Sequence, residues 1–365
     1  MDQLAERYRA NHGRLVAARD RLQAAVDAGA ATDDDRRRLG TVLELLTPVI
    51  VTAVNADGKV VEVRRPRQFL EVDPAGQGRA VEVHGELDQA RNVAVLVPGM
   101  GNSLDTFRGQ SDRGDLIRQE SGPGTAVVVW LDYDSPQGLP AAASKQAALD
   151  GGPRLATFLT DLDHLKTHDA KSTLIGHSYG TDVVGQALLN GGRADRVVLT
   201  GSPGITKYID EAADFVPTPT RLYVERAPGD YVAYSEWHGP DPATFPDAIR
   251  MATNDPLAND EAVSVHWHNE YYRPNSEALR NIGRVVRGDL TAITTTNTSR
   301  SAETKLALGA SWGGALNAVA GAASKVYDGV VSLTKPSQDS ARAAASKTSA
   351  QGFTSRSRQQ EGPRR

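Results

Sequence analysis

The chain has 365 residues, of which 39% are hydrophobic, a formal net charge of -4 and no cysteine. This composition allows one large α/β domain with appendages, excludes disulfides, thiolate catalysis and cysteine zinc sites, and offers no basic field to attract nucleic acid. The first residues lack the apolar stretch of a secretory signal, so a cytoplasmic protein is expected.

Residues 1–48 predict an N-terminal arm of two helices. An apolar stripe marks the first helix, and Thr32 before three aspartates caps the second, which Pro48 ends. Two interpretations stay open, a partner-binding or lid hairpin and an arm that packs on the main domain, and the second is favoured. The stripe consists of Leu4, Tyr8, Leu15, Leu22 and Val26.

Residues 49–290 predict the main domain. Turn residues and short β-rich runs indicate edge hairpins over residues 49–90. Over residues 91–290, apolar strands alternate with helical patterns, which favours a mostly parallel central sheet with helices on both faces. Functional groups should then lie in loops at the strand carboxyl ends. Strands are expected at residues 93–97, 125–130, 172–175, 196–200, 221–225 and 262–265.

The pentapeptide Gly-His-Ser-Tyr-Gly at residues 176–180 stands between an apolar run and a helical pattern. This context predicts a nucleophile elbow, in which a strained turn presents Ser178 at the top of the sheet. The elbow is therefore the first candidate for catalytic chemistry.

A serine nucleophile needs a base and an orienting carboxylate, which are expected downstream in the order Ser, acid, His. Asp230 follows the strand at residues 221–225 in an Ala-Pro-Gly-Asp turn and is the favoured acid. Asp241 and Asp255 are the weaker alternatives.

The run at residues 262–265 leads into His266-Trp-His268, where the general base should lie. Spacing leaves the two histidines nearly even, and His268 is favoured because it lies further beyond the strand. A metal site formed by His266, His268 and Glu270 would lack a third patterned ligand, so no metal and no cofactor are expected.

An oxyanion hole requires two backbone donors. The Tyr179 amide, directly after the serine, is one candidate. The Met100 amide, in the Pro-Gly-Met-Gly loop after residues 93–97, is the other, with Gly99 as the fallback.

Six motifs in this order resemble a known family. Over about residues 68–288, they are similar to the α/β-hydrolase family, abundant in actinobacteria, that is catalogued as a domain of unknown function. The resemblance implies the α/β-hydrolase fold and a triad of Ser178, Asp230 and His268. It also decides between the histidines, because the family's pattern resembles His-Ser-x-Tyr-Phe, although Asn269 stands where serine is usual. The motifs are Val95–Gly101, Gly176–Gly180, Gly201–Gly204, Ala227–Asp230, His238–Pro242 and His268–Tyr272.

The substrate is poorly specified by the pattern. Aromatic side chains between residues 205 and 260 would either line an apolar acyl or alcohol pocket or form the small core of a lid. Asp182 and Glu225 are interpreted as solvated or capping residues. The aromatic residues are Tyr208, Phe215, Tyr231, Tyr234, Trp237 and Phe245.

Residues 291–365 form an Ala-, Ser- and Gly-rich extension that is expected to be partly disordered. Residues 306–333 carry a thin apolar stripe at four-three spacing. Self-association through the terminal helices or lid docking is the favoured interpretation, and membrane contact by this segment is the weaker one, because large apolar residues are few.

The sequence thus predicts a cofactor-independent serine hydrolase that acts through an acyl-enzyme on a small-molecule substrate. Carboxylic esters are the first choice, and peptides or thioesters remain open. The alternative is a catalytically silent hydrolase fold that serves as a binding or assembly module.

Overall fold

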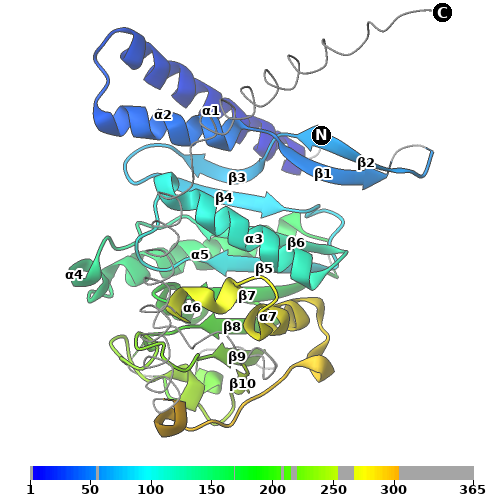
Figure 1. Cartoon of the computed structure of the whole chain (residues 1–365), viewed down its shortest axis with the longest axis vertical. Coiled ribbons are helices and arrows are strands. Elements are labelled where there is room, and N and C mark those ends of the chain that lie inside the picture. Colours follow the sequence, from blue (N-terminus) through cyan, green and yellow to red (C-terminus); the bar gives the residue numbers. More distant parts are fainter. Residues whose placement is uncertain are drawn as a thin grey trace, which may run out of the picture. The chain divides into compact units, whose positions relative to one another are not determined.

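An eight-stranded mixed sheet forms the centre of the computed structural model (Figure 1). Its strand order is β10-β9-β8-β7-β5-β6-β4-β3, parallel from β10 to β6 and antiparallel at the β6–β4 and β4–β3 pairs. The strands are β3 (Gln68–Asp73), β4 (Arg79–His84), β5 (Asn92–Val97), β6 (Thr125–Leu131), β7 (Lys171–His177), β8 (Arg196–Thr200), β9 (Arg221–Glu225) and β10 (Ile249–Met251).

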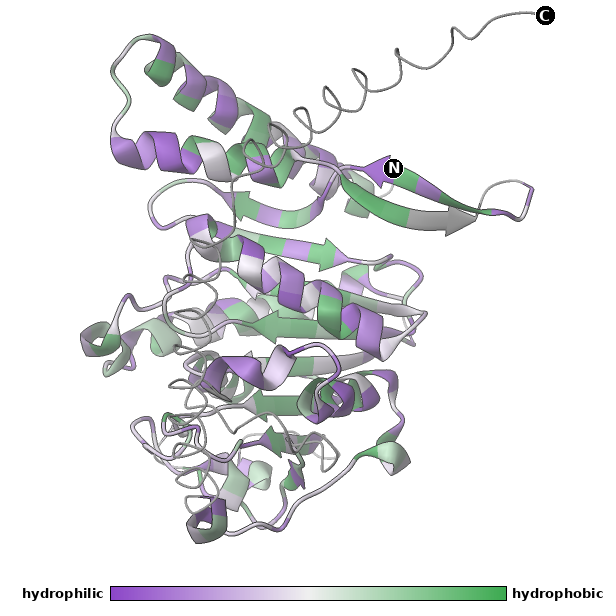
Figure 2. Ribbon diagram, viewed as in Figure 1, coloured by the Kyte–Doolittle hydropathy of each residue, from purple (hydrophilic) through white to green (hydrophobic). Residues whose placement is uncertain are grey.

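Helices cover both faces of this sheet. α3 (Phe107–Ser121) packs beside α7 (Glu277–Arg287) on one face, and α5 (Gln146–Leu165) packs beside α6 (Gly180–Leu189) on the other (Figure 1). The strands between them are continuously apolar, and every residue of β6 is buried (Figure 2). Strands shielded on both sides are expected to lack polar alternation. The predicted fold class, a mostly parallel sheet between two helical layers, is confirmed.

The structure describes residues 3–54, 57–167, 169–206, 209–214, 220–253 and 267–303. The strand predicted at residues 262–265 lies outside them. The edge strand β10 was not predicted, because its three residues are too few to form a pattern. Within the described ranges, no helix has both the length and the apolar character that a membrane crossing requires. The short elements are α4 (Leu139–Ala142), η1 (Leu104–Thr106), η2 (Ala212–Asp214), η3 (Pro242–Thr244), η4 (Trp267–Tyr272) and η5 (Leu290–Ala292).

The predicted N-terminal arm consists of α1 (Gln3–Asp27) and α2 (Asp33–Leu46). Thr32 caps α2 through a capping box with Asp35, which satisfies amides that the first helical turn leaves free. α1 packs on β3, and its Asn11 side chain donates a hydrogen bond to the Phe69 carbonyl at 3.0 Å. Arg7 pairs with Asp161 of α5 at 2.6 Å. These contacts attach the arm to the main domain.

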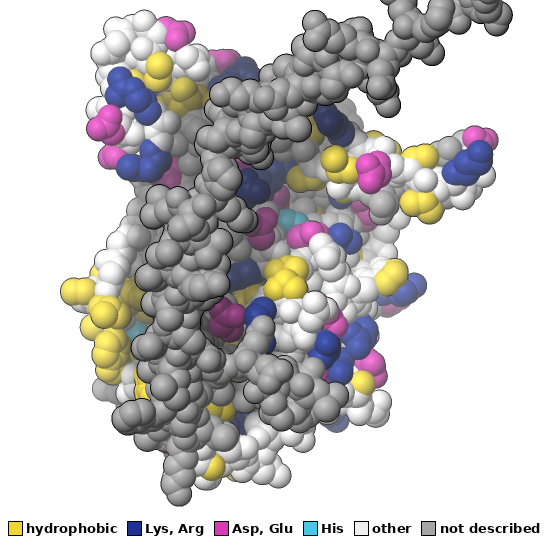
Figure 3. Space-filling view, viewed as in Figure 1, with side chains coloured by type: hydrophobic (Ala, Val, Ile, Leu, Met, Phe, Trp, Pro, Cys, Tyr) yellow, Lys and Arg dark blue, Asp and Glu magenta, His cyan; other side chains and the backbone are white. Residues whose placement is uncertain are grey.

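The hairpins predicted over residues 49–90 divide into two kinds. β3 and β4 join the main sheet, whereas β1 (Val49–Val54) and β2 (Val60–Arg65) form a separate antiparallel ribbon. A cavity of about 1080 Å³ lies between this ribbon, the end of α2, β4 and α3. Figure 3 shows this face hollowed beneath the ribbon, with acidic and basic side chains side by side in the hollow.

A buried ion pair lies in that hollow. The Arg67 guanidinium donates to both carboxylate oxygens of Glu82 at 2.6 and 2.7 Å and to Ser111 Oγ at 2.7 Å. Burial alone would raise the pKa of Glu82, but hydrogen bonds from His84 and Arg67 outweigh it and lower the pKa to about 2. The ionised carboxylate therefore stabilises the folded state.

Glu82→Gln should lower the stability of the fold at neutral pH, since Arg67 loses a bidentate partner. A depressed folded-state pKa contributes stability above the ordinary value of 4.5 that is lost as the pH falls toward 2. The difference between wild type and variant, roughly 3 kcal/mol from this displacement, should close over that window. Urea unfolding between pH 2 and 7 measures it, and a constant difference would contradict the assignment.

Candidate functional site

Ser178 lies in the turn between β7 and α6, with a backbone φ of 55°. This left-handed conformation is costly for a residue with a side chain and marks stored strain. A Cβ on Gly180 would lie 2.3 Å from the Val97 carbonyl oxygen, and one on Gly176 would lie 2.9 Å from Thr181 Cα. Only glycine fits at these two positions, and the turn has the geometry expected of a nucleophile elbow.

The structure brings Ser178, His268 and Asp230 together from three separate loops. Ser178 Oγ lies 2.7 Å from His268 Nε2, and His268 Nδ1 lies 2.9 and 3.0 Å from the two Asp230 oxygens. A carboxylate only accepts hydrogen bonds, so Nδ1 carries the proton and the Nε2 lone pair faces the serine hydroxyl. His268 lies in η4, and its side chain is 20% exposed.

The alternative acids and the alternative base considered from the sequence are not seen beside Ser178 or His268. Asp241 pairs with the Arg226 guanidinium and accepts a hydrogen bond from the Ala243 amide, so it does not face His268. Asp255 and His266 lie outside the described residues.

The Asp230 carboxylate is fully buried and accepts hydrogen bonds from several donors. Besides the imidazole, Oδ1 accepts from the Val232 and Ala233 amides at 3.1 Å each, and Oδ2 accepts from the Tyr271 hydroxyl at 2.6 Å. That hydroxyl itself accepts from the Ala227 amide at 3.0 Å. Burial, together with Asp230, raises the pKa of Tyr271 well above its ordinary value, so the hydroxyl remains a donor.

His177 holds the backbone that carries His268. Its Nε2 lies 2.7 Å from the His268 carbonyl oxygen and must donate to it, and its Nδ1 lies 3.4 Å from an Arg113 nitrogen. Burial, Arg113 and His268 lower the pKa of His177 well below its ordinary value. His177 is therefore neutral, which avoids a second positive charge when the His268 ring, 5.2 Å away, is protonated.

The loop after β5 passes directly beside the serine. A Cβ on Gly99 would lie 2.7 Å from Ser178 Cβ, so the glycine permits this approach. The Gly99 carbonyl oxygen accepts hydrogen bonds from Asn102 Nδ2 at 2.8 Å and Ser135 Oγ at 2.9 Å. These two donors fix the orientation of the peptide between residues 99 and 100, and the Tyr133 hydroxyl donates to the preceding carbonyl, that of Pro98, at 2.7 Å.

The fixed peptide also directs an amide. In a trans peptide the N–H and C=O groups point in opposite directions, so the Met100 N–H is directed away from the donors that hold the Gly99 carbonyl. Within the described ranges, no acceptor bonds to the Met100 or Tyr179 amide. Both candidate oxyanion donors are thus unoccupied by that part of the chain.

Several residues of this site were missed by sequence reasoning. Tyr133 and Ser135 follow the carboxyl end of β6, the strand beside β5, so the rule that located Asp230 could have found them. Tyr271 and His177 were quoted only as parts of motifs. No sequence signal links Tyr271 to an acid 41 positions away.

The burial of two acidic residues contradicts their interpretation from the sequence as solvated or capping residues. Asp182 and Glu225 are both fully buried. Asp182 Oδ2 lies 3.3 Å from His238 Nδ1, and the Glu225 carboxyl has no hydrogen-bond partner among the described residues. Burial, followed by the charge of Glu277, raises the pKa of Glu225 well above its ordinary value. The interpretation was wrong because both residues belong to elements that are packed on every side.

The predicted substrate walls divide between core and surface. Phe245 is buried, whereas Tyr231 and Trp237 are 49% and 59% exposed. Tyr208 and Phe215 lie outside the described residues. The part of the chain that the structure describes contains no group of three or more His, Asp or Glu side chains spaced to hold a metal ion.

The mostly parallel sheet and the serine elbow at the carboxyl end of β7 define a protein of the α/β-hydrolase fold. Residues 73–238 match the model of a family described as "Alpha/beta hydrolase". The resemblance inferred from the motifs is thereby confirmed. Asn269, where that resemblance expects serine, accepts a hydrogen bond from Arg113 at 3.4 Å.

The relatives include uncharacterized mycobacterial proteins. One, from Mycobacterium tuberculosis strain H37Rv, is 30% identical over 262 residues, which cover 61% of this chain and 39% of the relative. Another, from Mycobacterium bovis, is 29% identical over 203 residues, which cover 51% of this chain and 75% of the relative. The chain thus matches well under half the length of the first of these proteins.

Among solved structures, a carboxylesterase from Mesorhizobium loti is 15% identical, with a TM-score of 0.33, covering 59% of this chain and 95% of its own. The esterase domain of a Rhodothermus marinus protein is 16% identical, with a TM-score of 0.31, covering 67% of this chain and 99% of its own.

Glu225→Gln should make the protein more stable at neutral and alkaline pH. Because the folded-state pKa of Glu225 is raised above the ordinary 4.5, the stability of the wild type is highest below that value and falls as the pH rises toward the folded-state pKa. The amide cannot ionise, so the variant should lack this fall. Chemical unfolding between pH 4 and 9 compares them, and equal pH dependence in both proteins would refute a buried neutral Glu225.

Proposed function

We propose that the protein is a serine hydrolase that forms an acyl-enzyme on Ser178. The observation that carries this proposal is the continuous hydrogen-bonded arrangement of Ser178, His268 and Asp230 at a strained elbow. Its order along the chain, Ser, acid, His, is the order that this fold uses.

In the first half of the reaction, Ser178 Oγ attacks the carbonyl carbon of the substrate, and His268 Nε2 takes the hydroxyl proton. Asp230 holds the imidazole in the required tautomer and stabilises the imidazolium. The carbonyl oxygen becomes an oxyanion, to which the Met100 and Tyr179 amides are proposed to donate. His268 then gives its proton to the leaving oxygen as the bond to it breaks.

In the second half, a water molecule attacks the acyl-enzyme while His268 Nε2 accepts one of its protons. The tetrahedral intermediate collapses, the carboxylic acid leaves, and the proton returns to Ser178 Oγ. The neutral His177 beside His268 adds no positive charge next to the imidazolium in either half.

Carboxylic esters are the proposed substrates. Tyr231 and Trp237 follow Asp230 in one loop and offer exposed aromatic surface for an acyl or alcohol group. Peptides and thioesters share the same acyl chemistry, so an ester panel of increasing chain length, with matched thioesters and amides, identifies the class.

Intact-mass labelling with a fluorophosphonate should give a single adduct on the wild type and none on Ser178→Ala, because only an activated serine reacts. Ser202→Ala is the matched control: Ser202 is buried beside the elbow, but its hydroxyl bonds to Thr181, so this variant should still label. If the folded wild type takes no adduct, the hydrolase proposal fails and a binding or assembly module is favoured.

His268→Ala and Ser178→Ala should each lower turnover of a reactive ester by roughly 10⁴- to 10⁶-fold, because members of such a triad act as a unit. His266→Ala should change turnover far less. Initial rates of the three purified variants decide the assignment. An inactive His266→Ala variant together with an active His268→Ala variant would overturn the choice of His268 as the base.

A further inference from the structure

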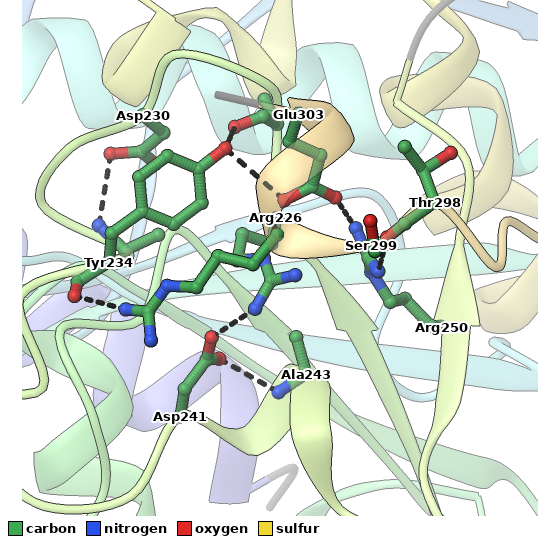
Figure 4. Close-up of polar contacts among 12 residues, drawn as sticks. Arg226, Asp230, Tyr234, Asp241, Ala243, Arg250, Thr298, Ser299 and Glu303 are labelled. Atoms are coloured by element: carbon green, nitrogen blue, oxygen red, sulfur yellow. Dashed lines mark hydrogen bonds and ion pairs between the residues drawn. The ribbon is translucent and has the colours of Figure 1, made fainter. Parts of the chain in front are cut away.

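Four charged side chains, three of them buried and one partly buried, lie together behind the loop that carries Asp230 (Figure 4). Arg226 directly follows β9, Arg250 lies in β10, and Asp241 precedes η3. Glu303 comes from a helical turn beyond the main domain as predicted from the sequence, and its side chain is only 1% exposed. Two positive and two negative charges thus compensate one another in this cluster.

Glu303 connects the two arginines. Its Oε2 accepts a hydrogen bond from Arg226 Nε at 3.0 Å, and its Oε1 pairs with the Arg250 guanidinium. Burial, followed by the charge of Arg226, lowers the pKa of Arg250 to about 10. Without Glu303, Asp241 would be the one carboxylate left in this cluster, and it pairs with Arg226.

Tyr234 joins this ion cluster to the loop of Asp230. Its hydroxyl lies 3.2 Å from Glu303 Oε2 and 3.3 Å from the Ala227 carbonyl oxygen. Its ring lies between two guanidinium groups, 5.5 Å from Arg226 Cζ and 5.4 Å from Arg300 Cζ. Arg300 and Glu303 belong to the same helical turn. That turn therefore contacts the Tyr234 ring through Arg300 and the Tyr234 hydroxyl through Glu303.

The same loop supplies the backbone donors of Asp230. The Val232 and Ala233 amides bond to its Oδ1, and they stand directly before Tyr234. On the inner side, the Ala227 amide bonds to the Tyr271 hydroxyl, which donates to Oδ2. Residues 226–234 are therefore held by Tyr271 on one side and by Glu303 on the other.

We infer that Glu303 is a positioning residue for Asp230, so that a segment beyond the predicted main domain completes the acid loop. The inference rests on the proposed function. Glu303 touches no reacting atom. It acts through Arg226 and Tyr234 on the amides that fix the carboxylate, and through the carboxylate on the His268 imidazole.

Steady-state kinetics on p-nitrophenyl butyrate test this in the full chain. Glu303→Ala should lower kcat by about 10²-fold, the usual result of a displacement near 1 Å at a reacting group, with KM changed less than kcat. Glu303→Gln keeps the side-chain volume and one acceptor oxygen, so its kcat should fall less than that of Glu303→Ala. It replaces the alanine variant in the test if that variant does not fold. Glu82→Gln removes an equally buried carboxylate from Arg67, remote from the elbow, and should retain wild-type kcat.

Acetate provides a second readout, because Glu303→Ala leaves a space between two guanidinium groups that fits a small carboxylate. Added acetate at constant ionic strength should restore part of kcat in Glu303→Ala and have no such effect on wild type, Glu303→Gln or Glu82→Gln. Chloride at the same concentration should not restore it.

Hydrogen exchange over residues 226–241 reports on the loop without relying on activity. The Val232 and Ala233 amides should exchange faster in Glu303→Ala than in wild type and remain slow in Glu82→Gln. If the wild type is active and kcat is unchanged in Glu303→Ala, or if Glu303→Ala and Glu82→Gln lose equal activity, the inference about Glu303 is overturned while the proposed function stands. An inert wild type refutes the proposed function, and unchanged exchange in Glu303→Ala then refutes the positioning of the loop as well.

Discussion

The burial of the Asp230 carboxylate is the constraint on which the site depends. A carboxylate without solvent stays ionised only when its lone pairs are occupied by donors. Here the donors come from its own loop, from the His268 imidazole and from Tyr271, so that one charged group binds η4 to the loop after β9. The orientation of the imidazole toward Ser178 follows from this demand for hydrogen bonds.

Hydrogen bonds from surrounding residues also fix the groups next to Ser178 and His268. Ser135 and Asn102 orient the peptide beside Ser178, Tyr133 holds the Pro98 carbonyl in the same loop, and His177 holds the backbone of His268. All of them stand at the carboxyl ends of neighbouring strands or on the elements that follow. The parallel sheet thus gathers short loops that are distant in sequence, and each loop is stiffened by a side chain from another.

Local patterns were enough to predict the elbow and the central strands. Continuous apolar runs and glycines at residues 176 and 180 are set by neighbours within a few positions. Topology indicated Ser178 and favoured Asp230, whereas spacing left His266 and His268 nearly even and the family resemblance selected His268. The contacts of Tyr271 and Glu303 with partners 41 and 77 positions away could not be predicted, because no rule of the fold assigns these two residues a partner. Glu225 was misjudged since a charged residue in isolation suggests solvent, and only tertiary packing reveals its burial.

Both ends of the eight-stranded sheet are protected against further strand pairing. At one end α1 packs on β3, and Asn11 occupies the Phe69 carbonyl oxygen. At the other, β10 has three residues, and Met251 already forms a β-bridge with Thr295. An exposed sheet edge is a template for aggregation, and short or covered edges suppress it. Among the residues that the structure describes, the eight-stranded sheet therefore disfavours the addition of a further strand at either of its edges.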